Sequence, residues 1–208
     1  LHFDLIHAHF TWPSGAVAVA LKQKYSIPVV ITEHTSSTFT KAIETQDKIF
    51  TDTWSKADKI IRVKQGDVSA FSRVNIPLQN VIPIPNGYDS KKFHPTDTQR
   101  CRETLHLPLD KKLILNVGNL YGEVKGHKYL IEAISHVVTK RKDILCLIIG
   151  AGKLRTALER QIRSLGLEDY VVLAGGKPHD EIPLWMNACD LFVLPSLNEG
   201  NPTVMFET

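Results

Sequence analysis

The 208-residue sequence contains no apolar run close to the roughly 20 residues that a membrane-spanning helix requires. It also contains no sequence repeat, no low-complexity tract and no basic run longer than Lys140-Arg141-Lys142. The 25 basic and 22 acidic residues give a formal charge of +3, so nothing calls for nucleic acid as a partner. With 43% apolar and 23% charged residues, the composition is that of an ordinary globular protein.

Cysteine is scarce, and its three residues, Cys101, Cys146 and Cys189, cannot all pair with one another. Two of them lie among apolar residues, so reduced thiols in a cytoplasmic protein are the expected state. The sequence also has neither a phosphate P-loop pattern nor a Gly-x-Ser-x-Gly elbow. The motifs that would predict a P-loop NTPase or a serine hydrolase are therefore missing.

What the sequence does contain is an alternation of short apolar runs with helical patterns. The expected strands cover residues 4–9, 28–32, 59–63, 81–84, 113–117, 144–149, 170–173 and 191–194. The expected helices cover residues 13–25, 41–56, 67–73, 126–141, 182–187 and a stretch that ends at residue 165. Such alternation predicts right-handed βαβ units and parallel sheets, an α/β fold. A turn-rich and then polar stretch separates two halves, and we place the boundary between residues 95 and 96.

The C-terminal stretch holds the most informative pattern. Residues 191–194 predict a strand buried on both faces, and Asn201-Pro202 predicts an N-cap followed by the first helical residue. The loop between them then lies at the carboxyl end of a parallel strand, where anions bind. The carboxylates of Glu199 and Glu207 beside this anion site suit hydroxyl groups rather than phosphate. A ligand that combines an anionic group with many hydroxyl groups is typical of a nucleotide sugar. The alternative is that both glutamates are solvated surface residues without a ligand.

A second candidate site follows the strand expected at residues 113–117. Gly118 and Gly126 allow the backbone to approach a ligand closely, and Lys125 stands at the mouth of the next helix. Backbone N–H groups, the helix dipole and the Lys125 ammonium together would hold a diphosphate. The alternative is a glycine-rich turn with a solvated lysine.

Histidines follow the first two strands. His34 comes just after residues 28–32, and it is either a structural histidine or a group that faces a ligand at the sheet edge. His7 and His9 share one face of the preceding strand, but no carboxylate or cysteine nearby completes a metal site. No metal ligands are therefore expected.

These patterns resemble the retaining glycosyltransferases of family 4. The resemblance is carried by Glu199 and Glu207 with seven residues between them, the preceding Leu194-Pro195-Ser196, the Lys125-Gly126 turn and the segment from Pro85-Asn86-Gly87 onward. It implies a GT-B fold, in which two Rossmann-like parallel-sheet domains face a cleft. Residues 1–95 would be the rear part of the acceptor-side domain with the hinge, and residues 96–208 a truncated donor-side domain. Both domains would be incomplete, so we expect a fragment that is inactive alone.

The resemblance also implies the reaction, which is transfer of a sugar from a nucleotide-sugar donor to an acceptor hydroxyl with retention at the anomeric carbon. Glu199, Lys125 and His34 would be the catalytic residues. The residues implied to bind the donor are Gly118, Asn119, Gly126, Gly200, Asn201, Pro202, Thr203, Glu207 and Lys177. No metal or other cofactor is implied, because the metal-dependent class of glycosyltransferases uses an Asp-x-Asp pair that this sequence lacks.

The expected partners are the donor and a glycan, glycolipid or small-molecule acceptor, in a cytoplasmic protein for which peripheral membrane association stays open. A nucleotide-sugar 2-epimerase or a phosphorylase would share the fold and is one alternative. A non-catalytic nucleotide-sugar-binding or scaffold protein is another. Asn119 keeps this second alternative open, because it stands where the family carries an arginine that contacts the diphosphate.

We predict that Asn119→Arg binds nucleoside diphosphates more tightly than the unchanged chain, because arginine adds a charge and a two-pronged donor. Isothermal titration of both chains with a nucleoside diphosphate measures the effect. Equal affinities would mean that this loop does not face the phosphates.

Overall fold

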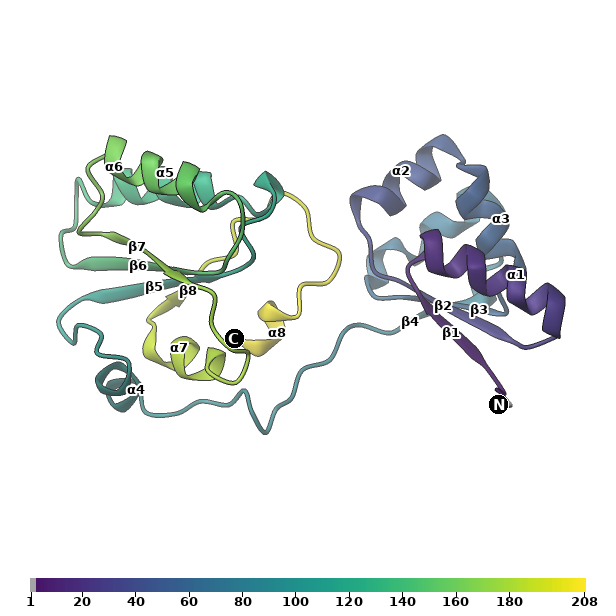
Figure 1. Cartoon of the computed structure of the whole chain (residues 1–208), viewed down its shortest axis with the longest axis horizontal. Coiled ribbons are helices and arrows are strands. Elements are labelled where there is room, and N and C mark those ends of the chain that lie inside the picture. Colours follow the sequence, from purple (N-terminus) through teal and green to yellow (C-terminus); the bar gives the residue numbers. More distant parts are fainter. Residues whose placement is uncertain (1–2) are drawn as a thin grey trace. The chain divides into compact units, whose positions relative to one another are not determined.

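The computed structural model describes residues 3–208, which form two compact units (Figure 1). The first unit comprises the chain up to Gly87 together with Asn198–Pro202, and the second comprises Tyr88–Leu197 and Thr203–Thr208. Each unit contains a four-stranded, fully parallel sheet. The predicted α/β class with two parallel sheets is confirmed. The division after Gly87 and the boundary expected after residue 95 fall in the same connecting segment.

In the first unit, the strands follow one another in space in the order β1-β2-β3-β4. They are β1 Ile6–His9, β2 Val29–Glu33, β3 Lys59–Arg62 and β4 Val81–Pro83. The α-helices are α1 Ala16–Tyr25, α2 Ser37–Thr45 and α3 Lys48–Lys56, with a π-helical turn at Thr11–Gly15 and 3-10 helices at Gln65–Val74 and Leu78–Asn80. Sheet and helices share one apolar core, centred on Ile31, Ile60, Trp54 and Phe71.

The single helix expected over residues 41–56 is wrong, because the structure has two helices there. Gln46 adopts a left-handed conformation, with a φ of 51°, and ends α2. The Asp47 carboxylate then accepts hydrogen bonds from the backbone N–H groups of Ile49 and Phe50 and caps α3. A capping residue inside the helical pattern is the signal in the sequence that marks this break.

In the second unit, the strands lie in the order β7-β6-β5-β8. They are β5 Lys112–Val117, β6 Ile144–Ile149, β7 Val171–Gly175 and β8 Leu191–Phe192. The α-helices are α4 Thr98–Thr104, α5 His127–Val137, α6 Arg155–Ser164, α7 Ile182–Ala188 and α8 Val204–Glu207, with a 3-10 turn at Glu123–Lys125. Helix α4 lies where only a polar connection was expected, and the Asp97 carboxylate caps it through the N–H of Arg100.

Helices cover both faces of this second sheet (Figure 1). Leu130 and Ile131 of α5 and Leu158 of α6 pack on one face, and Ile182 and Trp185 of α7 pack on the other. The strand order reverses beside β5, since the chain runs outward through β6 and β7 and returns to the other side of β5. In open parallel sheets, ligands bind outside the carboxyl ends of the strands at such a reversal.

Residues 191–194 do not form a strand buried on both faces, contrary to the expectation. Strand β8 has only two residues, pairs only with β5 among the described strands, and leaves Leu191 54% exposed. A strand at the edge of a sheet has neighbours on one side only, which explains this exposure. The chain nevertheless continues alongside β5, where the N–H of Val193 donates to the carbonyl oxygen of Leu115 (2.8 Å).

The helix start expected at Asn201-Pro202 is also wrong. Helix α8 begins at Val204, and Thr203 is its N-cap residue. The Asn201 side chain lies two residues before that N-cap and donates a hydrogen bond to the carbonyl oxygen of Val63 (2.7 Å). Glu207 is consequently the last residue of a four-residue helix.

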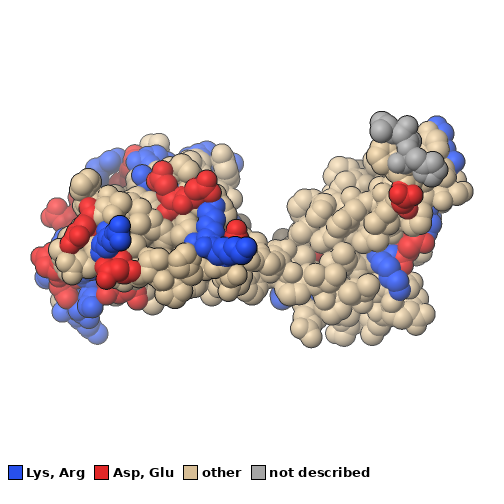
Figure 2. Space-filling view, turned by 90° about the horizontal axis from the view of Figure 1, so that it is seen from below, with Lys and Arg blue, Asp and Glu red and all other residues tan. Residues whose placement is uncertain are grey.

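In the view of Figure 2, charged side chains of both signs are interspersed over the second unit, whereas the visible face of the first unit carries few of them. None of the helices described in residues 3–208 is long and apolar enough to cross a membrane.

Asp190 connects the start of β8 to helix α4. Its carboxylate accepts hydrogen bonds from Arg102 Nη2 (2.7 Å), Lys112 Nζ (3.1 Å) and the N–H of Leu113 (2.7 Å). Burial acts to raise the pKa of Asp190, but these hydrogen bonds outweigh burial and hold the pKa below its ordinary value of 3.8. The stability that this carboxylate contributes is therefore present above pH 3.8 and is lost as the pH falls further.

We predict that Asp190→Asn lowers the free energy of unfolding at pH 7 by about 3 kcal/mol, because the buried Arg102 guanidinium loses its anion. Urea unfolding at several pH values measures the effect. The difference from the unchanged chain should shrink below pH 3.8, where the unchanged chain loses the same contribution. Equal stability at pH 7 would contradict the assignment.

Candidate functional site

The loop that follows β5 lies at the reversal of the second sheet and is held in place by the backbone. The N–H of Leu120 donates to the carbonyl oxygen of Ala151 (2.9 Å). A Cβ atom at Gly150 would lie 1.9 Å from the carbonyl oxygen of Gly118, and one at Gly152 would lie 2.4 Å from the carbonyl carbon of Leu120. The turn Gly150-Ala151-Gly152, which contains both glycines, is therefore required to support the loop.

The same loop ends in the 3-10 turn that carries Lys125, followed by Gly126 at the start of α5. Gly126 has a φ of +71°, and a Cβ atom there would lie 2.0 Å from the carbonyl oxygen of Pro195. The N–H of Leu197 donates to the carbonyl oxygen of Val124 (2.8 Å). The loops after β5 and β8 are thus locked together beside the reversal of strand order.

This arrangement suits an anion. Helix α5 is 11 residues long, and the first N–H groups of such a helix carry partial positive charge. Lys125 adds a full charge in the turn before the helix. The Asn119 side chain accepts a hydrogen bond from the N–H of Tyr121 (3.5 Å) and so folds back on its own loop. The structure therefore gathers four of the predicted residues in one loop, Gly118, Asn119, Lys125 and Gly126.

Two buried polar residues beside this loop were not predicted. Asn116 of β5 is 1% exposed, and its amide nitrogen donates to the carbonyl oxygen of Val193 (2.8 Å), which ties β5 to the chain beyond β8. His127 is 2% exposed, and burial, followed by the charge of Lys125, lowers its pKa. For Asn116, the signal in the sequence was a polar residue inside an otherwise apolar strand.

His34 lies in the first unit, directly beyond β2. Its Nε2 atom is 2.8 Å from Nδ1 of His9, the last residue of β1. A Cβ atom at Gly200 would lie 2.4 Å from the carbonyl oxygen of His34, so only glycine fits there. Within the first unit, the structure therefore brings His34 together with the backbone of Asn198–Pro202, the segment that contains Glu199.

Asn201 fixes this segment from two sides. Its side-chain nitrogen, Nδ2, donates to the carbonyl oxygen of Val63, beyond β3 (2.7 Å). Its backbone carbonyl oxygen accepts a hydrogen bond from the side chain of Asn86, beyond β4 (2.8 Å). Asn86 therefore positions the segment, which gives a local role to the Pro85-Asn86-Gly87 turn.

Two of the remaining predicted residues, Glu207 and Lys177, lie by the loop after β7. Glu207 accepts a hydrogen bond from Nε2 of His179 (3.1 Å), and Nδ1 of His179 is 2.9 Å from Nζ of Lys92. The Lys177 ammonium lies over the ring of Trp185, 5.0 Å from its centroid. The other two, Pro202 and Thr203, connect Asn201 to α8 along the chain.

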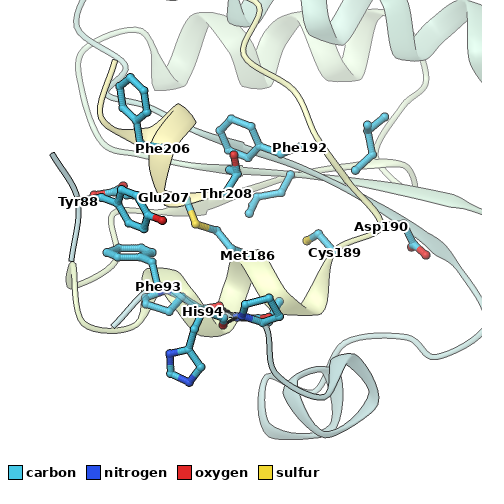
Figure 3. A pocket seen from close by; sticks show the side chains of 15 residues that line it. Tyr88, Phe93, His94, Met186, Cys189, Asp190, Phe192, Phe206, Glu207 and Thr208 are labelled. Atoms are coloured by element: carbon cyan, nitrogen blue, oxygen red, sulfur yellow. Dashed lines mark hydrogen bonds between the residues drawn. The ribbon is translucent and has the colours of Figure 1, made fainter. Parts of the chain in front are cut away.

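Glu207 also borders a cavity of about 360 Å³ (Figure 3). Aromatic side chains labelled in that view include Tyr88, Phe93 and Phe206. None of the described residues that line the cavity is a lysine or an arginine. It therefore offers no lysine or arginine to a diphosphate, in contrast to the loop around Lys125.

Metal ligation has no candidate in the described part of the chain. No three histidine, cysteine, aspartate or glutamate residues among residues 3–208 are placed to hold a metal ion.

Two protein families match the chain. The family of group 1 glycosyl transferases matches residues 97–208, and glycosyltransferase family 4 matches residues 1–92. Because the first match alone covers more than half of the sequence, the chain belongs to the group 1 glycosyl transferases. The resemblance to group 1 and family 4 glycosyltransferases is confirmed.

Individual relatives agree with this membership. TuaC of Bacillus subtilis (strain 168), named as a putative teichuronic acid biosynthesis glycosyltransferase, is 30% identical over all of this chain and 51% of its own length. HepE of Anabaena, solved with UDP, superposes with a TM-score of 0.83 at 23% identity, over 99% of this chain and 57% of HepE. Sucrose-phosphate synthase of Thermosynechococcus elongatus superposes with a TM-score of 0.84 at 24% identity, over 99% of this chain and 53% of the synthase. These likenesses confirm a fold of the GT-B type, and the chain spans about half the length of the curated relatives it matches.

We predict that Gly126→Ala destabilises the protein by about 3 kcal/mol, because a left-handed residue gains a Cβ atom that collides with Pro195. It should also weaken binding of nucleoside diphosphates, since relief of the collision separates the two loops. Thermal unfolding and isothermal titration measure both effects.

Gly166→Ala is the matched control. Gly166 has a φ of +63°, but a Cβ atom added there would meet nothing within 4 Å. Gly166→Ala should therefore lose only the stability that backbone strain costs, about 1 kcal/mol. Equal losses of stability in the two variants would show that the contact with Pro195 does not hold the loops.

Proposed function

We propose that this chain is the nucleotide-sugar-binding part of a glycosyltransferase that retains the configuration of the anomeric carbon. Membership of the group 1 glycosyl transferases supports this proposal. HepE of Anabaena has been solved with UDP and with UDP-glucose, which supports a nucleotide sugar as the donor. The observation that carries the proposal is the Lys125 turn at the start of α5, locked beside the strand reversal by Gly126 and Pro195.

Each residue then has a chemical task. Lys125 and the backbone N–H groups around Gly118 and Gly126 hold the diphosphate and stabilise the charge that develops when it leaves. Glu199 accepts hydrogen bonds from the donor sugar, and Glu207 accepts them from the ribose. His34 contacts the transferred sugar. The acceptor hydroxyl attacks from the side of the leaving diphosphate, which takes the proton of that hydroxyl, so the protein contributes positioning and charge stabilisation.

The two halves divide this work. Residues 96–208 supply Glu199 and the groups that hold the nucleotide, and residues 1–95 supply His34 and belong to the acceptor side. The acceptor is a glycan, a glycolipid or a small molecule with a free hydroxyl group. The name of the relative TuaC, which refers to teichuronic acid biosynthesis, favours a role in polysaccharide synthesis.

One observation favours a second function. Asn119 brings no charge to the diphosphate, and its side chain is bonded to its own loop. A protein that binds nucleotide sugars without transferring them needs less stabilisation of the leaving group. Product formation from a labelled donor separates the two functions. A transferase should form product and lose this activity in Glu199→Gln, whereas a binding protein should form none.

We predict that Lys125→Met weakens binding of UDP by at least about tenfold, because one charge-assisted hydrogen bond to a diphosphate contributes about 1.5–3 kcal/mol. The loss should shrink at high salt, since screening reduces the contribution of the ammonium.

Lys140→Met, which removes an exposed lysine beyond the end of α5, is the control and should leave the affinity within about twofold. Isothermal titration of UDP at two salt concentrations compares the three chains. An unchanged affinity in Lys125→Met would refute the proposed diphosphate site.

A further inference from the structure

Two histidines from neighbouring strands meet at the carboxyl edge of the first sheet. His9 ends β1, and His34 directly follows β2. Nδ1 of His9 and Nε2 of His34 are 2.8 Å apart, and the two ring planes differ by only 17°. Such a contact needs one protonated and one unprotonated nitrogen, so the rings share a single N–H group between them.

The buried Glu33 side chain builds this contact. It is 0% exposed, and its Oε2 atom accepts hydrogen bonds from the N–H (3.1 Å) and the hydroxyl (2.5 Å) of Thr11. Its Oε1 atom accepts from the N–H and the hydroxyl of Thr35, both at 2.7 Å. Thr11 belongs to the loop after β1 and Thr35 to the loop after β2. One side chain therefore fixes both loops and sets the spacing between their histidines.

The surroundings favour a neutral His34. Burial is the main cause that lowers the pKa of His34, and the neighbouring His9 lowers it further. Glu33 acts in the opposite direction, while Arg62 of β3 and His7 of β1 add to the lowering. At neutral pH the ring is therefore uncharged and able to share one proton with His9. An N–H···N hydrogen bond requires one unprotonated ring nitrogen, which a neutral His34 can supply.

We infer that His9 is a positioning residue for His34, whose ring orientation and tautomer it sets through this hydrogen bond. The inference rests on the proposed function, in which His34 contacts the donor sugar. Because Nε2 of His34 is engaged by His9, the other ring nitrogen, Nδ1, is the atom that meets a sugar hydroxyl. From the sequence alone, His9 is only a weak candidate for a metal ligand, and its partnership with His34 depends on the register of β1 against β2.

Neighbouring residues provide matched variants. His9→Ala removes the hydrogen bond to His34. His9→Asn keeps an amide oxygen near the former position of Nδ1, so it should restore that hydrogen bond without an imidazole ring. His7→Ala is the control, because His7 lies on the same strand but bonds to the Thr32 hydroxyl (2.7 Å) instead of His34. His9 and His7 are both exposed, so the three variants should fold.

Nitrogen-15 NMR of the imidazole rings across a pH titration gives the first readout. In the unchanged chain, His34 should show one dominant neutral tautomer and a pKa below 6.5. His9→Ala should raise this pKa toward 6.5 and mix the tautomers, and His9→Asn should restore a single tautomer. His7→Ala should leave the tautomer unchanged. A His34 tautomer that does not respond to His9→Ala would overturn the inference.

Donor binding gives the second readout. His9→Ala should weaken binding of UDP-glucose by about threefold to tenfold, the range expected for one hydrogen bond. The affinity for UDP should stay within about twofold of that of the unchanged chain. His34→Ala should cause the same selective loss, and the double variant should lose no more than either single one. A loss of UDP and UDP-glucose affinity in equal measure would mean that His9 acts on the fold and not through His34.

The two readouts separate the inference from the proposed function. If the unchanged chain binds neither UDP nor UDP-glucose, the proposed function fails. The ring titration still decides whether His9 sets the tautomer of His34. If both ligands bind and the titration shows no response to His9→Ala, only the inference fails.

Discussion

The close approach of Gly126 to the carbonyl oxygen of Pro195 is the constraint on which the rest of the second unit depends. It requires a glycine for two independent reasons, the left-handed backbone and the absence of room for a Cβ atom. It fixes the start of α5 against the chain that leaves β8, and Gly150 and Gly152 support the same loop from the other side. Backbone packing thus holds the N–H groups of a helix terminus at the reversal of the sheet, where an anion can use them.

The first unit works by different chemistry. Its strand ends carry imidazole rings and a buried carboxylate whose two oxygens are both bonded to threonines. The imidazole rings suit hydroxyl groups, which both donate and accept hydrogen bonds, whereas the buried carboxylate holds the loops that carry the rings. The segment Asn198–Pro202 belongs to this unit through the contacts of Gly200 and Asn201, although the chain on either side of it belongs to the second unit. The proposed anion-binding groups therefore lie in the second unit, and the imidazole rings and the buried carboxylate lie in the first.

The sequence predicted well those features that local patterns encode. The continuous apolar run of β6 is buried at every position, and the Lys125-Gly126 turn lies between β5 and α5 as its spacing indicated. Prediction failed where neighbours decide the outcome. Leu191 is apolar but exposed because β8 lies at a sheet edge, and Asn201 resembles an N-cap but donates to Val63. Glu33 is a polar residue beside His34 in the sequence, and its burial between Thr11 and Thr35 could be found only from the tertiary structure.

The most direct test of the account is the location of UDP on the chain, measured by the amide resonances that shift when UDP is added to the isotopically labelled protein. The account predicts that the largest shifts fall in the loop from Gly118 to Gly126 and in the first turn of α5. Shifts centred instead on the cavity lined by Tyr88, Phe93 and Phe206 would contradict it, because the nucleotide would then bind away from Lys125.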